Sequence, residues 1–143
     1  MNKCLNLISE FGTKHNLTFS SQEILKDSIV CLDGVHRKLL IVKIFQEVIY
    51  FSEVIDLKDV KSCSVKKQYG SIYGGALQTK KLDAYLETIH LNFEFVNGMD
   101  LLEVKFFHHI ENHLSEMVEL EKKAKQWEIM LSGMMRTSLE KTA

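Results

Sequence analysis

Residues 88–107 constrain the fold most, because two runs of alternating apolar and polar residues flank a turn dipeptide. The first run is Thr88 to Val96, and the second is Leu101 to Phe107. Alternation with a period of two is typical of a strand that buries one face. Between the runs stands Asn97-Gly98, the pair favoured at the two positive-φ positions of a type I′ turn. The sequence therefore predicts a β-hairpin.

A loop of only these two residues would also set the strand register. Val96 then stands opposite Met99, and each apolar side chain of the first strand meets an apolar partner, in the pairs Phe93 with Leu102, Leu91 with Val104, and Ile89 with Phe106. The polar residues pair as Asn92 with Glu103 and His90 with Lys105. A slip by one residue would turn the apolar set to the opposite face.

Further strands are predicted upstream, in a chain without proline. Ser28 to Leu32 and His36 to Ile44 flank the turn dipeptide Asp33-Gly34, and the turn Gln46-Glu47 leads into Val48 to Phe51. A tight turn is expected at Asp56 to Asp59, followed by a strand from Val60 to Lys67. The polar segment from Thr18 to Asp27 is ambiguous.

Helical patterns stand at both ends. Asn2 to about His15 predicts a short helix that ends near Asn16 and docks on its own domain or on a second copy. Leu114 to about Arg136 predicts a long amphipathic helix, with an apolar stripe at Met117, Leu120, Ala124, Trp127, Leu131 and Met134. The stripe is too short for a coiled coil. We therefore expect it to cover the sheet, with Trp127 in the core.

The length of 143 residues indicates one domain: a helical arm at 1–27, an antiparallel sheet at 28–107, and a helix with a tail at 108–143. The expected fold class is α+β, mainly antiparallel β, with six or seven strands.

A net charge of −1 gives no electrostatic attraction to nucleic acid. No apolar run exceeds four residues, so no transmembrane segment is expected. The scattered cysteines Cys4, Cys31 and Cys63 favour reduced thiols in the cytoplasm.

The element order resembles the pleckstrin-homology-like fold, especially its bacterial members. The resemblance covers about Ser28 to Met135, and it is carried by Lys38 to Ile41, Ile55 to Val60, the 89–107 hairpin and the helix around Ala124 to Trp127. It implies a barrel or sandwich with one open end closed by the C-terminal helix. It also implies that loops and strand edges bind proteins, peptides or lipid head groups, without an active site.

One glycine-rich segment is the strongest candidate binding site. It contains Tyr69, Gly70, Tyr73, Gly74 and Gly75, and four lysines flank it, namely Lys66, Lys67, Lys80 and Lys81. Tyrosines, lysines and flexible glycines together can form a lip for a peptide or an anion. The alternative is an ordinary surface connection whose lysines serve solubility.

Two other clusters are weaker candidates. His109 and His113 would share a helix face with His108 nearby, but a third metal ligand is not evident, and a polar connection capped by Asn112 or Ser115 explains the pattern. His36, Arg37 and Lys38 supply too few basic residues for a phosphate clamp.

No catalytic or cofactor motif is present in the sequence. We therefore expect a non-enzymatic module, either a monomer or a homodimer, that binds a protein or peptide through the Gly/Tyr loop or a strand edge. Peripheral contact with a membrane is compatible with this expectation. The alternative is a protein that binds a small ligand or an anionic lipid head group.

Overall fold

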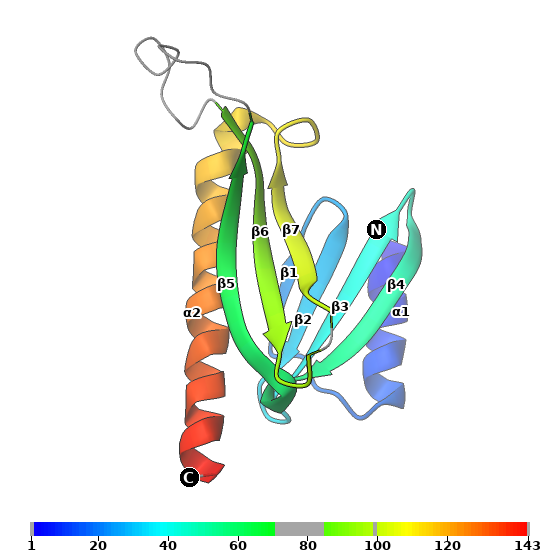
Figure 1. The fold of residues 1–143 in the computed structure, drawn as a ribbon. Coiled ribbons are helices and arrows are strands. Elements are labelled where there is room, and N and C mark those ends of the chain that lie inside the picture. The colour runs from blue at the N-terminus through cyan, green and yellow to red at the C-terminus, as the bar shows by residue number, and fades with distance from the viewer. Residues whose placement is uncertain (1, 71–84, 99, 143) are drawn as a thin grey trace. The chain divides into compact units, whose positions relative to one another are not determined.

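The computed structural model describes residues 2–70, 85–98 and 100–142, and the described chain is α+β as expected (Figure 1). Its helices are α1 (Asn2–Lys14) and α2 (Met117–Thr142), with short 3-10 turns η1 (Leu57–Asp59) and η4 (Leu114–Glu116). The described strands are β1 (Ser21–Ile24), β2 (Ser28–Asp33), β3 (Lys38–Phe45), β4 (Val48–Asp56), β5 (Val60–Tyr69), β6 (Leu86–Phe95) and β7 (Leu102–His108). These strands form two antiparallel sheets and no closed barrel.

The chain divides into two compact units. The first contains residues 1–61 and 134–143, and the second contains residues 62–133. The sheet of the first unit has the order β1-β2-β3-β4, and that of the second has the order β5-β6-β7. The prediction of one domain stays a prediction.

In the first unit, α1 packs on one face of the four-stranded sheet (Figure 1). Ile8 of α1 joins a buried cluster with Ile29 and Leu40, to which Leu5, Phe11, Phe19, Ile44, Ile49 and Val54 add partly buried side chains. An isolated helix of 13 residues is marginal in water, so this contact supplies its stability. The structure thus shows the N-terminal helix docked on its own chain.

The end of α1 follows from Asn16, which the sequence indicates as a stop. Asn16 takes a positive φ of 57°, which Asn tolerates better than most residues. The Leu17 N–H donates to the Gly12 carbonyl at 2.8 Å, and the Asn16 N–H donates to the Thr13 carbonyl at 3.4 Å. This pair of bonds is a Schellman motif, which satisfies carbonyls at the end of a helix.

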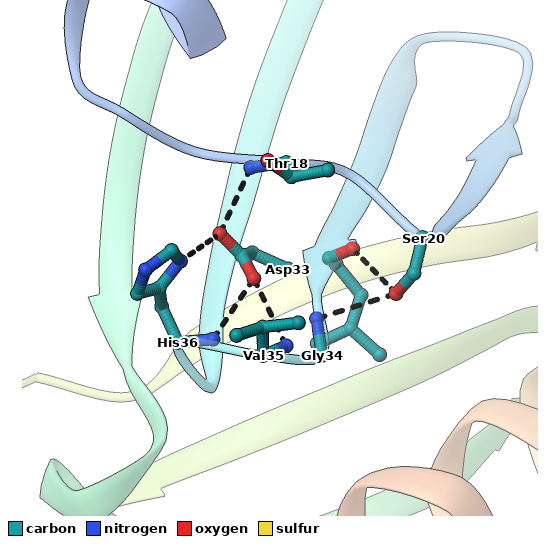
Figure 2. A network of polar contacts seen from close by, with 7 residues as sticks. Thr18, Ser20, Asp33, Gly34, Val35 and His36 are labelled. Carbon is teal, nitrogen blue, oxygen red and sulfur yellow. Dashed lines mark hydrogen bonds and ion pairs between the residues drawn. The ribbon is translucent and has the colours of Figure 1, made fainter.

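The turn at Asp33-Gly34 differs from the two-residue hairpin turn expected. β2 ends at Asp33 and β3 begins at Lys38, so the loop has four residues, and the positive φ of 55° falls on Arg37. The Asp33 carboxylate accepts the backbone N–H groups of Val35 and His36 at 3.0 and 2.9 Å, and it lies 2.6 Å from His36 Nδ1 (Figure 2). The aspartate therefore organises the loop with its side chain.

The same carboxylate also holds the segment before β1. It accepts the Thr18 N–H at 2.9 Å, while Ser20 Oγ donates to the Leu32 carbonyl and accepts the Gly34 N–H, both at 3.2 Å (Figure 2). Residues 21–24 then form β1 and pair with β2. The predicted arm at 1–27 is therefore helical only in its first half.

In the second unit, the predicted hairpin is confirmed in its main register. Phe93 pairs with Leu102, and the same register holds for Leu91 with Val104, Asn92 with Glu103 and His90 with Lys105. The alternating apolar side chains Ile89, Leu91, Phe93 and Phe95 are all buried. One face of this sheet is therefore an apolar core face.

Two details of the hairpin prediction are wrong. Ile89 pairs with Phe107 rather than Phe106, because a bulge between Ile89 and His90 shifts the register and leaves an extra residue on β7. Of the two predicted turn residues, Asn97 and Gly98, Gly98 alone has a positive φ, 74°, and its N–H donates to the Phe95 carbonyl at 3.4 Å. The turn is therefore not type I′, which needs a positive φ at both central residues.

The predicted long helix corresponds to η4 and α2. The first 17 residues of α2 belong to the second unit and run alongside β5 (Figure 1). Trp127 is buried, as are Met117, Ala124 and Leu131 of the same stripe. Glu128 accepts the Val65 N–H at 2.5 Å, and Lys67 forms an ion pair with Glu121. The expectation that Trp127 lies in the core is confirmed.

Candidate binding surfaces

The Gly/Tyr segment predicted from the sequence falls only partly within the structure. Tyr69 is the last residue of β5, and Gly70 follows it with its N–H donating to the Tyr85 carbonyl at 2.8 Å. Tyr73, Gly74, Gly75, Lys80 and Lys81 lie outside the described residues. The predicted lip of this loop therefore stays a prediction.

The two described lysines of this segment differ. Lys66 is exposed, whereas Lys67 is ion-paired with Glu121, which also contacts Lys125 at 3.4 Å. The hydrogen bond from Lys67 is the main reason that the pKa of Glu121 is lowered, although burial opposes it. An anion at Lys67 would compete with this carboxylate. Less positive charge is therefore available to bind an anion here than the sequence predicts.

A pocket of about 460 Å³ opens beside Gly70 in the second unit. We call it the Glu87 pocket. It is lined by Gly70, Tyr85, Leu86, Glu87, Phe107, His109 and Leu114. The ends of β6 and β7 meet here, where the His109 N–H donates to the Glu87 carbonyl at 2.9 Å. The structure thus brings one residue of the predicted loop and one of the histidine cluster to the same pocket.

The histidine cluster makes local hydrogen bonds. Ile110 N–H donates to His108 Nδ1 at 3.2 Å, and His113 N–H donates to the Glu116 carboxylate at 3.1 Å. Asn112 accepts the His108 N–H, so it does not cap the helix as proposed from the sequence, and His113 is the capping residue of η4. Among the described residues, no three His, Cys, Asp or Glu side chains are grouped as metal ligands.

The basic residues after β2 do not gather into a clamp. The Arg37 guanidinium donates to the Met134 carbonyl at 3.4 Å, and Lys38 begins β3 with a partly buried side chain. His36 is bound to Asp33. Each of the three residues therefore has a separate environment.

The β3–β4 hairpin carries an apolar surface that the sequence did not predict. Phe45, Val48 and Tyr50 are 66%, 64% and 65% exposed, and with Gln46 they line an apolar pocket of about 460 Å³. We call these four residues the hairpin patch. Large apolar side chains that gather on a surface mark interaction sites in many proteins. The sequence shows an unbroken apolar run at 48–51. Because the run contains no alternation of apolar and polar residues, it could not show which of these side chains face water.

The turn under the hairpin patch is held in an unfavourable conformation. Gln46 and Glu47 both have a positive φ, 50° and 64°, where Gly, Asn and Asp are the usual residues. Strained backbone of this kind is found preferentially at functional sites. The turn sets Phe45 opposite Val48 in the strand ladder, so it fixes the shape of the hairpin patch.

Comparison with protein-family models, curated proteins and solved structures finds no match. The resemblance to the pleckstrin-homology-like fold therefore stays a prediction. No helix among the described residues is long and apolar enough to cross a membrane.

Proposed function

We propose that this chain is a non-enzymatic binding module that takes up an extended segment of a partner protein along strand β4, with the hairpin patch as the anchor. The observation that carries the proposal is the exposure of Phe45, Val48 and Tyr50 together beside the edge strand of the first sheet. Aromatic side chains are enriched at protein interfaces and supply much of the binding energy there.

The position of β4 supports recognition through the backbone. Within the described sheet β4 is hydrogen-bonded to β3 alone, so its outer side presents backbone N–H and C=O groups. An extended peptide can add to such an edge as a further strand. β4 spans nine residues from Val48 to Asp56, which is long enough to pair with a peptide of ordinary strand length.

The composition of β4 supports a partner as well. Its first eight residues, Val48 to Ile55, contain one charged side chain, Glu53, and no proline. Exposed apolar edge strands of this kind promote aggregation unless something covers them. A partner segment with apolar side chains at alternate positions would cover the hairpin patch, because side chains along a strand alternate between its faces.

The proposed experiment selects peptides from a random display library against the full-length chain and measures their affinity by fluorescence anisotropy. We expect Tyr50→Ala and Phe45→Ala each to weaken binding about tenfold or more, as truncation of an aromatic anchor does. The matched control is Ile24→Ala, which removes an exposed apolar side chain from the opposite edge strand, β1. Selected peptides whose affinity is unaffected by both hairpin variants would contradict the proposal.

The alternative is binding of a small ligand or an anionic lipid head group near Lys66 and Lys67, which has less support because Lys67 is paired with Glu121. Electrostatic binding of this kind must weaken as salt rises. Sedimentation with vesicles containing phosphatidylserine, at low and high salt, tests it. Salt-sensitive sedimentation lost in Lys66→Ala would favour the alternative over the peptide.

We further propose a pleckstrin-homology-like family membership and a cytoplasmic location. The order of four strands, three strands and a long helix supports the first. The two free, buried thiols of Cys31 and Cys63 support a reducing compartment for the second.

A further inference from the structure

We propose that the Glu87 pocket binds an organic ammonium ion. This site lies in the second unit, apart from the peptide-binding edge. Its charge preference is opposite to that of the lysine-rich lip expected from the sequence. Three observations carry the inference: a carboxylate with no hydrogen bond or ion pair to the rest of the described chain, aromatic and aliphatic side chains in the lining, and a close approach of that carboxylate to a glycine.

The carboxylate of Glu87 stands where the sheet would otherwise continue its apolar face. Along β6, Glu87 shares a face with Ile89, Leu91 and Phe93, which are fully buried. Glu87 itself is partly buried, and its carboxylate has no hydrogen bond or ion pair to any described residue. A partly desolvated negative charge is unfavourable unless a positive group compensates it.

Gly70 allows this carboxylate to lie at the pocket wall. A Cβ added to Gly70 would stand 2.7 Å from Glu87 Oε1, closer than a Cβ atom approaches another heavy atom in proteins. Any other residue at this position would therefore displace the carboxylate. The glycine predicted to give loop flexibility acts here by leaving room for a charge.

The rest of the lining indicates the class of cation. A divalent metal ion normally needs three or more protein ligands, and the described residues offer no such group. Phe107, Tyr85 and Leu114 add aromatic and aliphatic side chains to the lining, next to its polar groups. Aromatic rings attract ammonium groups through their π electrons, and aliphatic walls suit a hydrocarbon body. One carboxylate in this setting matches one ammonium group on an apolar ligand, such as a free amine or a lysine side chain.

The test is a titration of the full ¹⁵N-labelled chain with benzylamine, which is an ammonium ion at pH 7, followed by backbone amide shifts. Benzyl alcohol, of nearly the same shape without the charge, is the matched ligand control. We expect saturable shifts at Gly70, Glu87 and His109 with benzylamine and much weaker ones with the alcohol. Equal shifts with both ligands, or none at millimolar benzylamine, would overturn the proposal.

Two variants test the role of the carboxylate. Glu87→Gln keeps the side-chain shape and removes the charge, and we expect about tenfold weaker binding, the effect of losing one charge-assisted hydrogen bond. Gly70→Ala keeps the charge but displaces it, and it should also weaken binding. Because the displaced group is a flexible side chain, we expect the Gly70→Ala variant to keep its fold, and its amide spectrum checks this. The control is Glu94→Gln, which changes an exposed glutamate on the same strand. Unchanged affinity in Glu87→Gln would overturn the proposal.

A second ligand separates the two sources of the ammonium group. N-acetyl-lysine methylamide presents the group as a protein side chain does. Binding of both this compound and benzylamine would indicate a pocket open to lysine side chains. Binding of benzylamine alone would indicate a site for small free amines. Both results support an ammonium site, and both are independent of peptide binding at β4.

Discussion

Replacement of Asp33 by alanine should destabilise the chain strongly, because this carboxylate is fully buried and holds three backbone N–H groups. Each partly buried donor left without an acceptor costs about 1 kcal/mol. The loss should therefore be about 3 kcal/mol, a large part of the 5–15 kcal/mol typical of a domain. Asp33→Asn should lose about half as much, since its amide retains one oxygen acceptor.

The assay is urea unfolding at pH 7, followed by circular dichroism. Asp59→Asn is the control, because Asp59 is an exposed aspartate in η1. A free energy of unfolding in Asp33→Ala equal to that of the wild type would rule out this stabilising role of the carboxylate. It would show that water replaces the carboxylate without loss.

The same network predicts a pH dependence. Burial alone would raise the pKa of Asp33, but the hydrogen bonds from His36 and Thr18 outweigh it and lower the pKa from 3.8 to about 2. Because the folded pKa lies below the unfolded one, the contribution to stability is complete above pH 3.8 and is lost as the pH falls towards 2. Asp33→Asn should lack this acid-dependent loss, and an identical acid unfolding curve in both proteins would contradict the assignment.

Three further predictions concern packing, backbone strain and thiol reactivity. Trp127→Ala should lower the free energy of unfolding by about 3–5 kcal/mol, because this side chain is buried. The control Ile129→Ala, at a site 72% exposed on the same helix, should change it by less than about 0.5 kcal/mol. Thermal unfolding tests both. Replacing Gln46-Glu47 by Asn-Gly should stabilise the chain by about 1 kcal/mol in urea, because both positions have a positive φ. Burial raises the pKa of the Cys31 and Cys63 thiols to about 12, so Ellman's reagent at pH 8 should react with these two only after unfolding. Rapid native-state reaction of more than one of the three thiols per chain would refute their burial.

The hairpin at 88–107 was predictable because two runs of alternating apolar residues flank a turn dipeptide there. Alternation fixes which side chains face the core, and a register that pairs Phe93 with Leu102 keeps the alternating apolar residues of both strands on that face. The bulge that brings Phe107 opposite Ile89 was not predictable, because Phe106 and Phe107 are equally apolar and both become buried. The pattern therefore could not choose between them.

The loop after β2 was mispredicted for a different physical reason. Asp-Gly commonly forms a two-residue turn through its backbone, but here the Asp33 side chain binds the N–H groups of Val35 and His36. Side-chain bonding of this kind leaves no mark on the hydrophobic pattern. β1 was missed similarly, because a short edge strand with half its residues exposed needs few apolar side chains.

The candidate sites show the same limit. The apolar run at 48–51 predicted a strand correctly, but its outward-facing side chains became visible only once the packing of α1 against the sheet was known. Glu87 carried a signal that could have been used. It continues the alternation of Ile89, Leu91 and Phe93 in phase, so it places a carboxylate at the end of a core face.

Amide hydrogen exchange along β4, measured by NMR with and without a selected peptide, is the most direct test of strand addition at this edge. We expect outward-facing amides between Val48 and Asp56 to exchange more slowly when the peptide is bound, because they gain backbone partners in a new strand pair. Slower exchange confined to β1 or to the β6–β7 hairpin, with β4 unchanged, would contradict it.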